Sequence, residues 1–223
     1  MPRISNPKAT FLLAHTRFSI NELRRYLHTL KKQLEIIAKD YKQYADQESE
    51  KIRDAREKDE FYEFSVERHW DYTIAFPRIL LNSFHVTAYT FFESEVFSLA
   101  SRIGRKQKQL FDVSDFPGRD YLKIASFYIL KLTGVKAQEF QAWNPIDDGR
   151  HIRNIIVHSN GIPSTQHDFD LARRYGFIDE STLEFSSGRA ILRLSITYEY
   201  CQSFLQTMEE FFTELYSKAR KYF

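Results

Sequence analysis

Apolar side chains recur at steps of three and four along most of this chain, the spacing of amphipathic helices. The first such stretch predicts a helix over 19–46, with Ser19 and Glu22 in the spacing of a capping box at its start. Its apolar positions form a narrow seam, made of Leu23, Leu27, Leu30, Leu34, Ile37, Tyr41 and Tyr44. The seam is typical of a helix that lies along a bundle, and a coiled coil with a partner chain is the alternative.

Charges of both signs dominate residues 45–60, which we interpret as a solvated continuation of this helix or as a flexible connector. An aromatic-rich region follows, in which Pro77 is expected to start or kink a helix. From there to Arg102 apolar residues lie on nearly all sides, with Gly104 as the expected C-terminal stop. A helix that is apolar nearly all round indicates the centre of a bundle.

The rest of the chain predicts a third helix from Tyr121 to Gly134, a fourth over 144–160, a hairpin over 182–195 and a C-terminal helix over 197–222. The hairpin is expected from two short β-leaning runs around Ser187, Gly188 and Arg189. We therefore predict an all-α, up-and-down helical bundle with long N-terminal helices and a small β-hairpin before the last helix. The whole chain, 1–223, is interpreted as a single domain.

The composition agrees with long helices, because 7 Gly and 6 Pro among 223 residues leave few helix breakers. The 20 Phe and 13 Tyr residues supply a sizeable core, and the net charge of +2 neither indicates nor excludes a nucleic-acid partner. A single cysteine, Cys201, excludes a disulfide within the chain and fits a reducing compartment. No stretch approaches the roughly 20 apolar residues of a membrane span, so we expect a cytoplasmic protein without a membrane partner.

The fourth helix carries the segment RHIRNIIVHSNG, residues 150–161, and both of its ends have local signals. Asn144 is expected as N-cap with Pro145 next, and Asn160 with Gly161 suits a C-terminus. On a helical wheel the core face consists of Ile152, Ile155 and Ile156, and the opposite arc of Arg150, His151, Arg153, Asn154 and His158. Val157 stands in the middle of that polar arc, which indicates that another chain covers it.

Arg153 and His158 lie about 140° apart on this wheel and about 7.5 Å apart along the axis, so they would flank a phosphodiester. Arginine binds phosphate in a bidentate manner, and histidine transfers protons near neutral pH, which are two roles that RNA cleavage needs. The spacing alone does not decide, because Arg78 and His85 repeat it in an apolar region, where we interpret His85 as a core histidine. The alternative for the motif is a solvated Arg153 and a histidine that interacts with the helix C-terminus.

The string RNIIVHSNG resembles the signature of the HEPN superfamily, in which an arginine, a polar residue and a histidine share one helix of a small all-α domain. Asn154 fills the polar place. The resemblance extends over 80–165, where AYTFFESEVFSLASRI looks like the second helix of prokaryotic members and YLKIASFYILKLTGV precedes the motif helix.

HEPN proteins dimerise through their motif helices, and many are metal-independent ribonucleases in defence, toxin–antitoxin and RNA-processing systems. The resemblance implies that Arg153 holds the scissile phosphate, His158 transfers the proton and Asn154 orients them, in a composite site shared by two copies. Further substrate contacts are expected from Arg150, His151, Ser159, Asn160 and Glu93. The implied partners are RNA, a second copy and a cognate antitoxin or other partner protein, with no cofactor.

A toxin subset of this family, paired with small nucleotidyltransferases, carries a tyrosine two places after the histidine, where this chain has Asn160. Regulation at that tyrosine is therefore not expected. Some members are inactive, so a scaffold or a nucleotide- or RNA-binding module that uses Arg150, Arg153 and His158 is the alternative function. A zinc ion held by His151 and His158 is not expected, because the two lie about two turns apart.

Overall fold

The structure, a computed structural model, describes residues 6–118, 120–178, 183–186 and 189–223. Its main helices are α1 (Pro7–Lys51), α2 (Ala55–Trp70), α3 (Phe76–Lys106), α4 (Tyr121–Thr133), α5 (Trp143–Ser159), α6 (Gln166–Arg174) and α7 (Tyr198–Lys218). Short segments are the π-helical η1 (Asp71–Ala75) and the 3-10 turns η2 (Val113–Asp115), η3 (Ala137–Glu139) and η5 (Arg220–Tyr222). Strands β1 (Leu183–Ser186) and β2 (Arg189–Leu192) pair antiparallel. The predicted all-α bundle with a small hairpin is confirmed. Arg189, predicted between the two runs, is the first residue of β2, and Ser187 and Gly188 lie outside the described residues.

The first helix is longer at its start than the predicted 19–46. It begins at Pro7, because the Asn6 side chain accepts hydrogen bonds from the backbone N–H groups of Lys8 (3.0 Å) and Ala9 (3.4 Å). Ala9 and residues further along this first stretch are buried, so packing also holds it. The capping-box interpretation of Ser19 is therefore wrong, and Ser19 lies inside α1.

A break divides the charged segment 45–60 between two helices. α1 ends at Lys51, and the Asp54 side chain caps α2 by accepting from Glu57 N at 2.9 Å. The segment is thus mostly a solvated helical surface with a short turn inside it, combining the two interpretations of the sequence.

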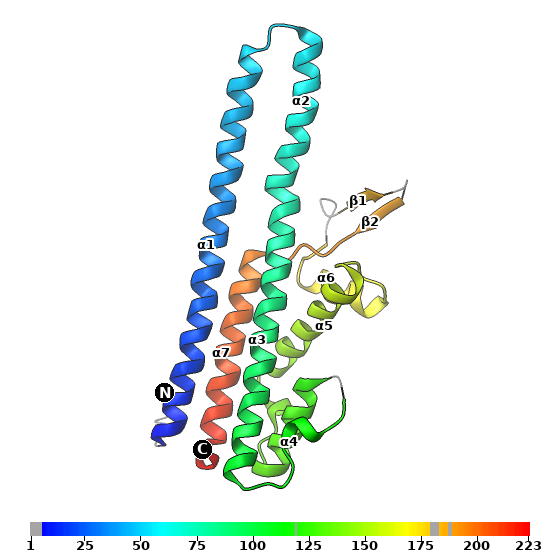
Figure 1. The fold of residues 1–223 in the computed structure, drawn as a ribbon. Coiled ribbons are helices and arrows are strands. Elements are labelled where there is room, and N and C mark those ends of the chain that lie inside the picture. Colours follow the sequence, from blue (N-terminus) through cyan, green and yellow to red (C-terminus); the bar gives the residue numbers. More distant parts are fainter. Residues whose placement is uncertain (1–5, 119, 179–182, 187–188) are drawn as a thin grey trace.

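Pro77 stands at the start of α3 and neither breaks nor ends the helical path. The π-helical segment η1 joins α2 to α3, so the three form one continuous rod (Figure 1). A proline ring clashes with the carbonyl four residues earlier, and the wider π-turn relieves that clash.

Two parts of the bundle differ in packing. In the base, which we define as α1 up to Leu30 together with α3, α4, α5 and α7, helix α1 packs on α7, and α3 packs on α4 and α5. The projecting hairpin, residues 31–70, is the antiparallel pair formed by the second half of α1 and by α2, and it extends beyond the other helices (Figure 1). Among the described helices, none is long and apolar enough to cross a membrane.

Helix α3 passes through Gly104 and ends at Lys106, so the expected stop at Gly104 is wrong. Gly104 serves close packing instead, because a Cβ there would collide with the Tyr128 hydroxyl. That hydroxyl donates to Phe111 O at 2.6 Å and holds the loop after α3. The predicted stop at Gly134 is confirmed, in the left-handed conformation that suits a helix C-cap.

The motif helix α5 starts at Trp143, with Ala142 as N-cap and no side-chain cap, so the expected N-cap role of Asn144 is wrong by two residues. Its end is as predicted, with Asn160 as left-handed C-cap followed by Gly161 at positive φ. Helix α6 was not predicted, although the reciprocal hydrogen bonds of Thr165 and Asp168 form a capping box at its start.

Candidate active site on helix α5

A cavity of about 300 Å³ opens beside α5, where α3 and the start of α4 meet it. Its lining residues are Tyr89, Glu93, Asp120, Tyr121, Arg150, Arg153, Asn154 and His158. The cavity therefore collects the three predicted catalytic residues and two of the predicted substrate contacts.

Arg153 and Asn154 are joined within the cavity. The Arg153 Nη1 donates to Asn154 Oδ1 at 3.0 Å, which fits an orienting role for the amide. The Arg153 Nε is shielded from solvent and has no hydrogen-bond partner within the described ranges. His158 is exposed at the edge of the cavity. A phosphate held by the guanidinium would thus have an accessible imidazole beside it.

Arg150 is committed to carboxylates of the protein itself. Its Nε donates to Asp147 Oδ1 at 2.8 Å, and its Nη1 lies 3.5 Å from Asp120 Oδ2. The side chain is only 15% exposed. These ion pairs hold Arg150 in the wall of the cavity. Because the two carboxylates offset its positive charge, Arg150 should attract a substrate less strongly than Arg153 does.

Glu93, one of the predicted substrate contacts, enters the cavity from α3. Burial raises the pKa of its carboxyl, and the positive charge of Arg153 opposes this shift. A carboxyl with a raised pKa beside the guanidinium of Arg153 suits proton exchange or a hydrogen bond to an anionic ligand.

Three lining residues were missed in the sequence: Tyr89, Asp120 and Tyr121. Asp120 had a local signal, because its side chain caps α4 by accepting from Lys123 N at 3.1 Å. The Tyr89 hydroxyl is buried without a hydrogen-bond partner in the described residues, and burial followed by the charge of Glu93 raises its pKa. Nothing local marks Tyr89 or Tyr121 as part of a polar site.

Three predicted substrate contacts lie outside this cavity. His151 faces α6, where its ring lies 4.9 Å from that of His167, and its Nε2 is 2.9 Å from Arg150 Nη2. Burial and then the charge of Arg150 lower the pKa of His151. Ser159 is not among the cavity residues, and Asn160 lines a separate cavity of about 350 Å³ between the end of α5 and the start of α3.

The second Arg-to-His pair of the sequence is not a site. His85 is buried, and its Nε2 donates to Gly149 O at 2.9 Å. This confirms the prediction of a core histidine, which here supports the motif helix from beneath. Val157 is 46% exposed on α5, and a second chain that covers it stays a prediction.

Within the described ranges, no group of three or more histidine, cysteine or acidic side chains is arranged to hold a metal ion. Comparison with models of protein families, with curated proteins and with solved structures found no match to this chain. The resemblance to HEPN proteins therefore rests on the motif residues and their setting in the helical bundle.

Proposed function

We propose that this protein is a metal-independent endoribonuclease of the HEPN type, which acts as a homodimer in a defence, toxin or RNA-processing system. The observation that supports the proposal most directly is the cavity where Arg153, Asn154 and His158 of one helix lie with Glu93 of another. A phosphate-binding group, an orienting amide and a proton-transfer group then share one concave surface.

In the proposed reaction, Arg153 binds the scissile phosphate and stabilises the charge that develops on its oxygens. His158 accepts the proton of the ribose 2′-hydroxyl as that oxygen attacks phosphorus. The bond from phosphorus to the 5′-oxygen breaks, and the same histidine of the second copy protonates the leaving oxygen. The products are a 2′,3′-cyclic phosphate and a 5′-hydroxyl, so no metal or redox partner enters the balance.

The test is cleavage of single-stranded RNA by the purified protein in EDTA. His158→Ala and Arg153→Ala should each lower the rate about 100-fold or more if the two groups act on the reacting phosphate. His15→Ala and Arg173→Ala, at exposed positions of α1 and α6, are matched controls and should leave the rate unchanged. Full activity of either motif variant would refute the assignment.

Association of two copies has its own test at Val157. Val157→Glu should yield monomers and lose cleavage while the thermal unfolding temperature stays near that of the wild type, because the side chain is exposed in one copy. Sedimentation velocity measures the first effect. A wild-type protein that is monomeric while it cleaves RNA would rule out the composite site.

A second function, binding of RNA or a nucleotide without turnover, is favoured by the pairing of Arg150 with Asp147 and Asp120, which reduces the positive charge of the cavity. Under this alternative the wild type binds RNA saturably and Arg153→Ala weakens binding, while no cleavage accumulates over hours. A cognate antitoxin or other partner protein would act on the same surface in either case.

A further inference from the structure

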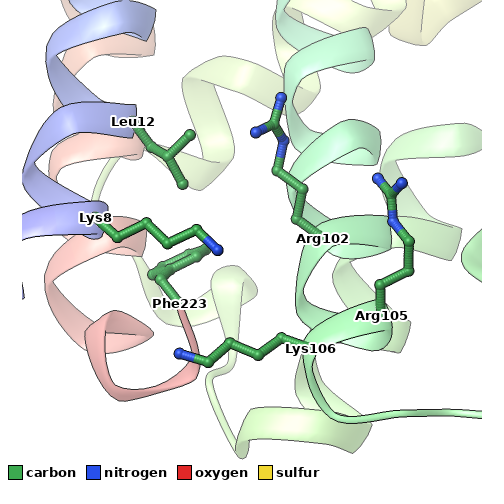
Figure 2. Close-up of a pocket in the computed structure, with 6 residues that line it drawn as sticks. All are labelled: Lys8, Leu12, Arg102, Arg105, Lys106 and Phe223. Carbon is green, nitrogen blue, oxygen red and sulfur yellow. The ribbon is translucent and has the colours of Figure 1, made fainter.

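A third cavity, of about 610 Å³, lies at the end of the base, away from the projecting hairpin. It is formed by the start of α1, the last turns of α3 and Phe223 (Figure 2). Its lining residues are Lys8, Leu12, Arg102, Arg105, Lys106 and Phe223. Four of these six described residues have a positively charged side chain, and none has an acidic side chain.

These cations have little compensation from the protein. In the part of the chain that the structure describes, Lys8, Arg105 and Lys106 form no ion pair, and Arg102 makes one long hydrogen bond, from Nε to Ser98 Oγ at 3.4 Å. By contrast, two arginines further along α1, Arg17 and Arg24, both form ion pairs with Glu209 of α7. Because like charges that surround one cavity repel one another, an external anion would relieve this arrangement.

The frame around the cavity is fixed by contacts between distant parts of the chain. The Asn6 side chain donates to Arg220 O at 2.8 Å and to Phe223 O at 3.2 Å, which ties the last residues to the start of α1. The ring of Phe223 packs at 5.3 Å from that of Tyr216. Leu12 and Phe223 therefore form an apolar wall, and the cations extend from two different helices past it (Figure 2).

We propose that this cavity binds a small ligand that carries two or more adjacent phosphate groups, such as an inorganic or a nucleoside polyphosphate. Arginine and lysine together provide bidentate and point-charge contacts to phosphate oxygens. The volume lies in the range of small-ligand sites. Figure 2 shows Lys8 reaching from α1 toward α3, with Arg102 and Lys106 on α3 at the other side, so a chain of phosphates would bridge the two helices.

This site is separate from the α5 cavity. Arg102 follows Glu93 by nine positions on α3, which places them about 180° apart around the helix and about 13.5 Å apart along it. Binding at the basic cavity is therefore independent of whether the α5 site cleaves RNA.

Isothermal titration calorimetry of the full chain with tripolyphosphate and with ATP tests the proposal. Both should bind saturably, with affinity that falls as salt rises. Equal affinities would assign recognition to the phosphates alone, and tighter ATP binding would add a contact to the nucleoside. The double variant Arg102→Gln/Lys106→Gln should weaken binding about 100-fold. Lys32→Gln/Lys39→Gln, which removes the same charge from exposed positions of α1, should bind like the wild type.

Thermal unfolding separates loss of the site from loss of the fold. Without ligand, Arg102→Gln/Lys106→Gln should unfold at or above the wild-type temperature, because repulsion is removed. Tripolyphosphate should stabilise the wild type and the control but not this variant. The proposal fails if neither ligand binds at millimolar concentration, if the double variant binds normally, or if only an RNA oligonucleotide binds at this surface.

Discussion

The base and the projecting hairpin have similar helical periodicity and very different burial. The buried residues of α1 end at Leu27, and no residue of α2, all of which the structure describes, is buried. In the base, by contrast, α3 and α7 each bury a long series of aliphatic and aromatic side chains. Periodicity thus predicts that a segment is helical, while burial depends on which other elements reach that segment. The α5 cavity and the basic cavity both lie in the base, where packing can hold their side chains in place.

The seam on α1 offers the strongest test of this difference in burial. Leu27 of the base and Leu34 of the hairpin are both leucines and lie seven positions apart. Leu27→Ala should lower the free energy of unfolding by about 2–5 kcal/mol, since Leu27 is fully buried. Leu34→Ala should cost about 1 kcal/mol or less, because Leu34 is only partly buried. Urea denaturation measures both. Equal losses would mean that the hairpin is packed as tightly as the base, as in a coiled coil with a partner chain.

The free energy of unfolding should depend on pH through His85, which is buried in the base. Burial lowers the pKa of His85 to about 4 from 6.5, while the hydrogen bond to Gly149 opposes the shift. Between these pH values the unfolded chain binds more protons than the folded one, so stability falls as pH falls. The His85 contribution should amount to about 3 kcal/mol between pH 7 and pH 4.

The measurement for His85 is the difference in unfolding free energy between wild type and His85→Gln at each pH. The Gln amide can still donate to Gly149 O, so the difference should shrink by this amount on acidification. His69→Gln, the same substitution at an exposed position of the hairpin, is the control and should change the unfolding free energy at pH 7 by less than about 0.5 kcal/mol. A constant difference for His85→Gln would contradict a buried neutral histidine.

Close packing under the motif helix predicts a smaller effect at Gly149. A Cβ there would collide with the ring of Phe204. Gly149→Ala should therefore destabilise by about 1–2 kcal/mol, even though alanine favours the helix by up to ~1 kcal/mol. Asp59→Glu adds one carbon at an exposed position of the hairpin and should change stability by less than about 0.5 kcal/mol. A stabilised Gly149→Ala variant would show that α5 is not closely packed against Phe204 of α7.

The smallest effect is expected from an ion pair on the hairpin surface. Arg56 and Glu60 lie 3.2 Å apart with side chains 89% and 67% exposed. Arg56→Ala should change the unfolding free energy by less than about 0.5 kcal/mol at low salt, and by less at high salt. A loss above about 1 kcal/mol would mean that surface pairs, rather than burial, hold the hairpin together.

Sequence reasoning succeeded where local chemistry sets the outcome. Gly134 and Asn160 end their helices as predicted because the left-handed cap needs those residue types. It failed at the start of α1, because the spacing of Ser19 and Glu22 lies inside a longer helix, which Asn6 caps and buried residues such as Ala9 hold.

At the candidate site as well, residues on one helix could be predicted, and residues from other helices could not. Arg153, Asn154 and His158 were predicted because their string resembles a family signature, and they share one helix, so periodicity also fixes their relative positions. His151 was expected to join them, but α6, which was not predicted, packs beside it. Tyr89 and Asp120 arrive from other helices, and their proximity depends on the packing of α3 and α4 against α5, which no local pattern encodes.

The π-helical segment η1 lets the continuous rod hold one extra residue. Its wide turn contains one residue more than an α-helical turn, so deleting one residue from Asp71–Ala75 would restore α-helical geometry there. Because the wide turn accommodates the extra residue locally, the helix faces before and after it would keep their relation, and the same side of α2 would still face α1. Deleting one residue from the regular part of α2 would instead turn everything before it by about 100° around the helix axis. We therefore expect the loss of a single codon to leave the surface of the hairpin unchanged at η1 and to change it within α2.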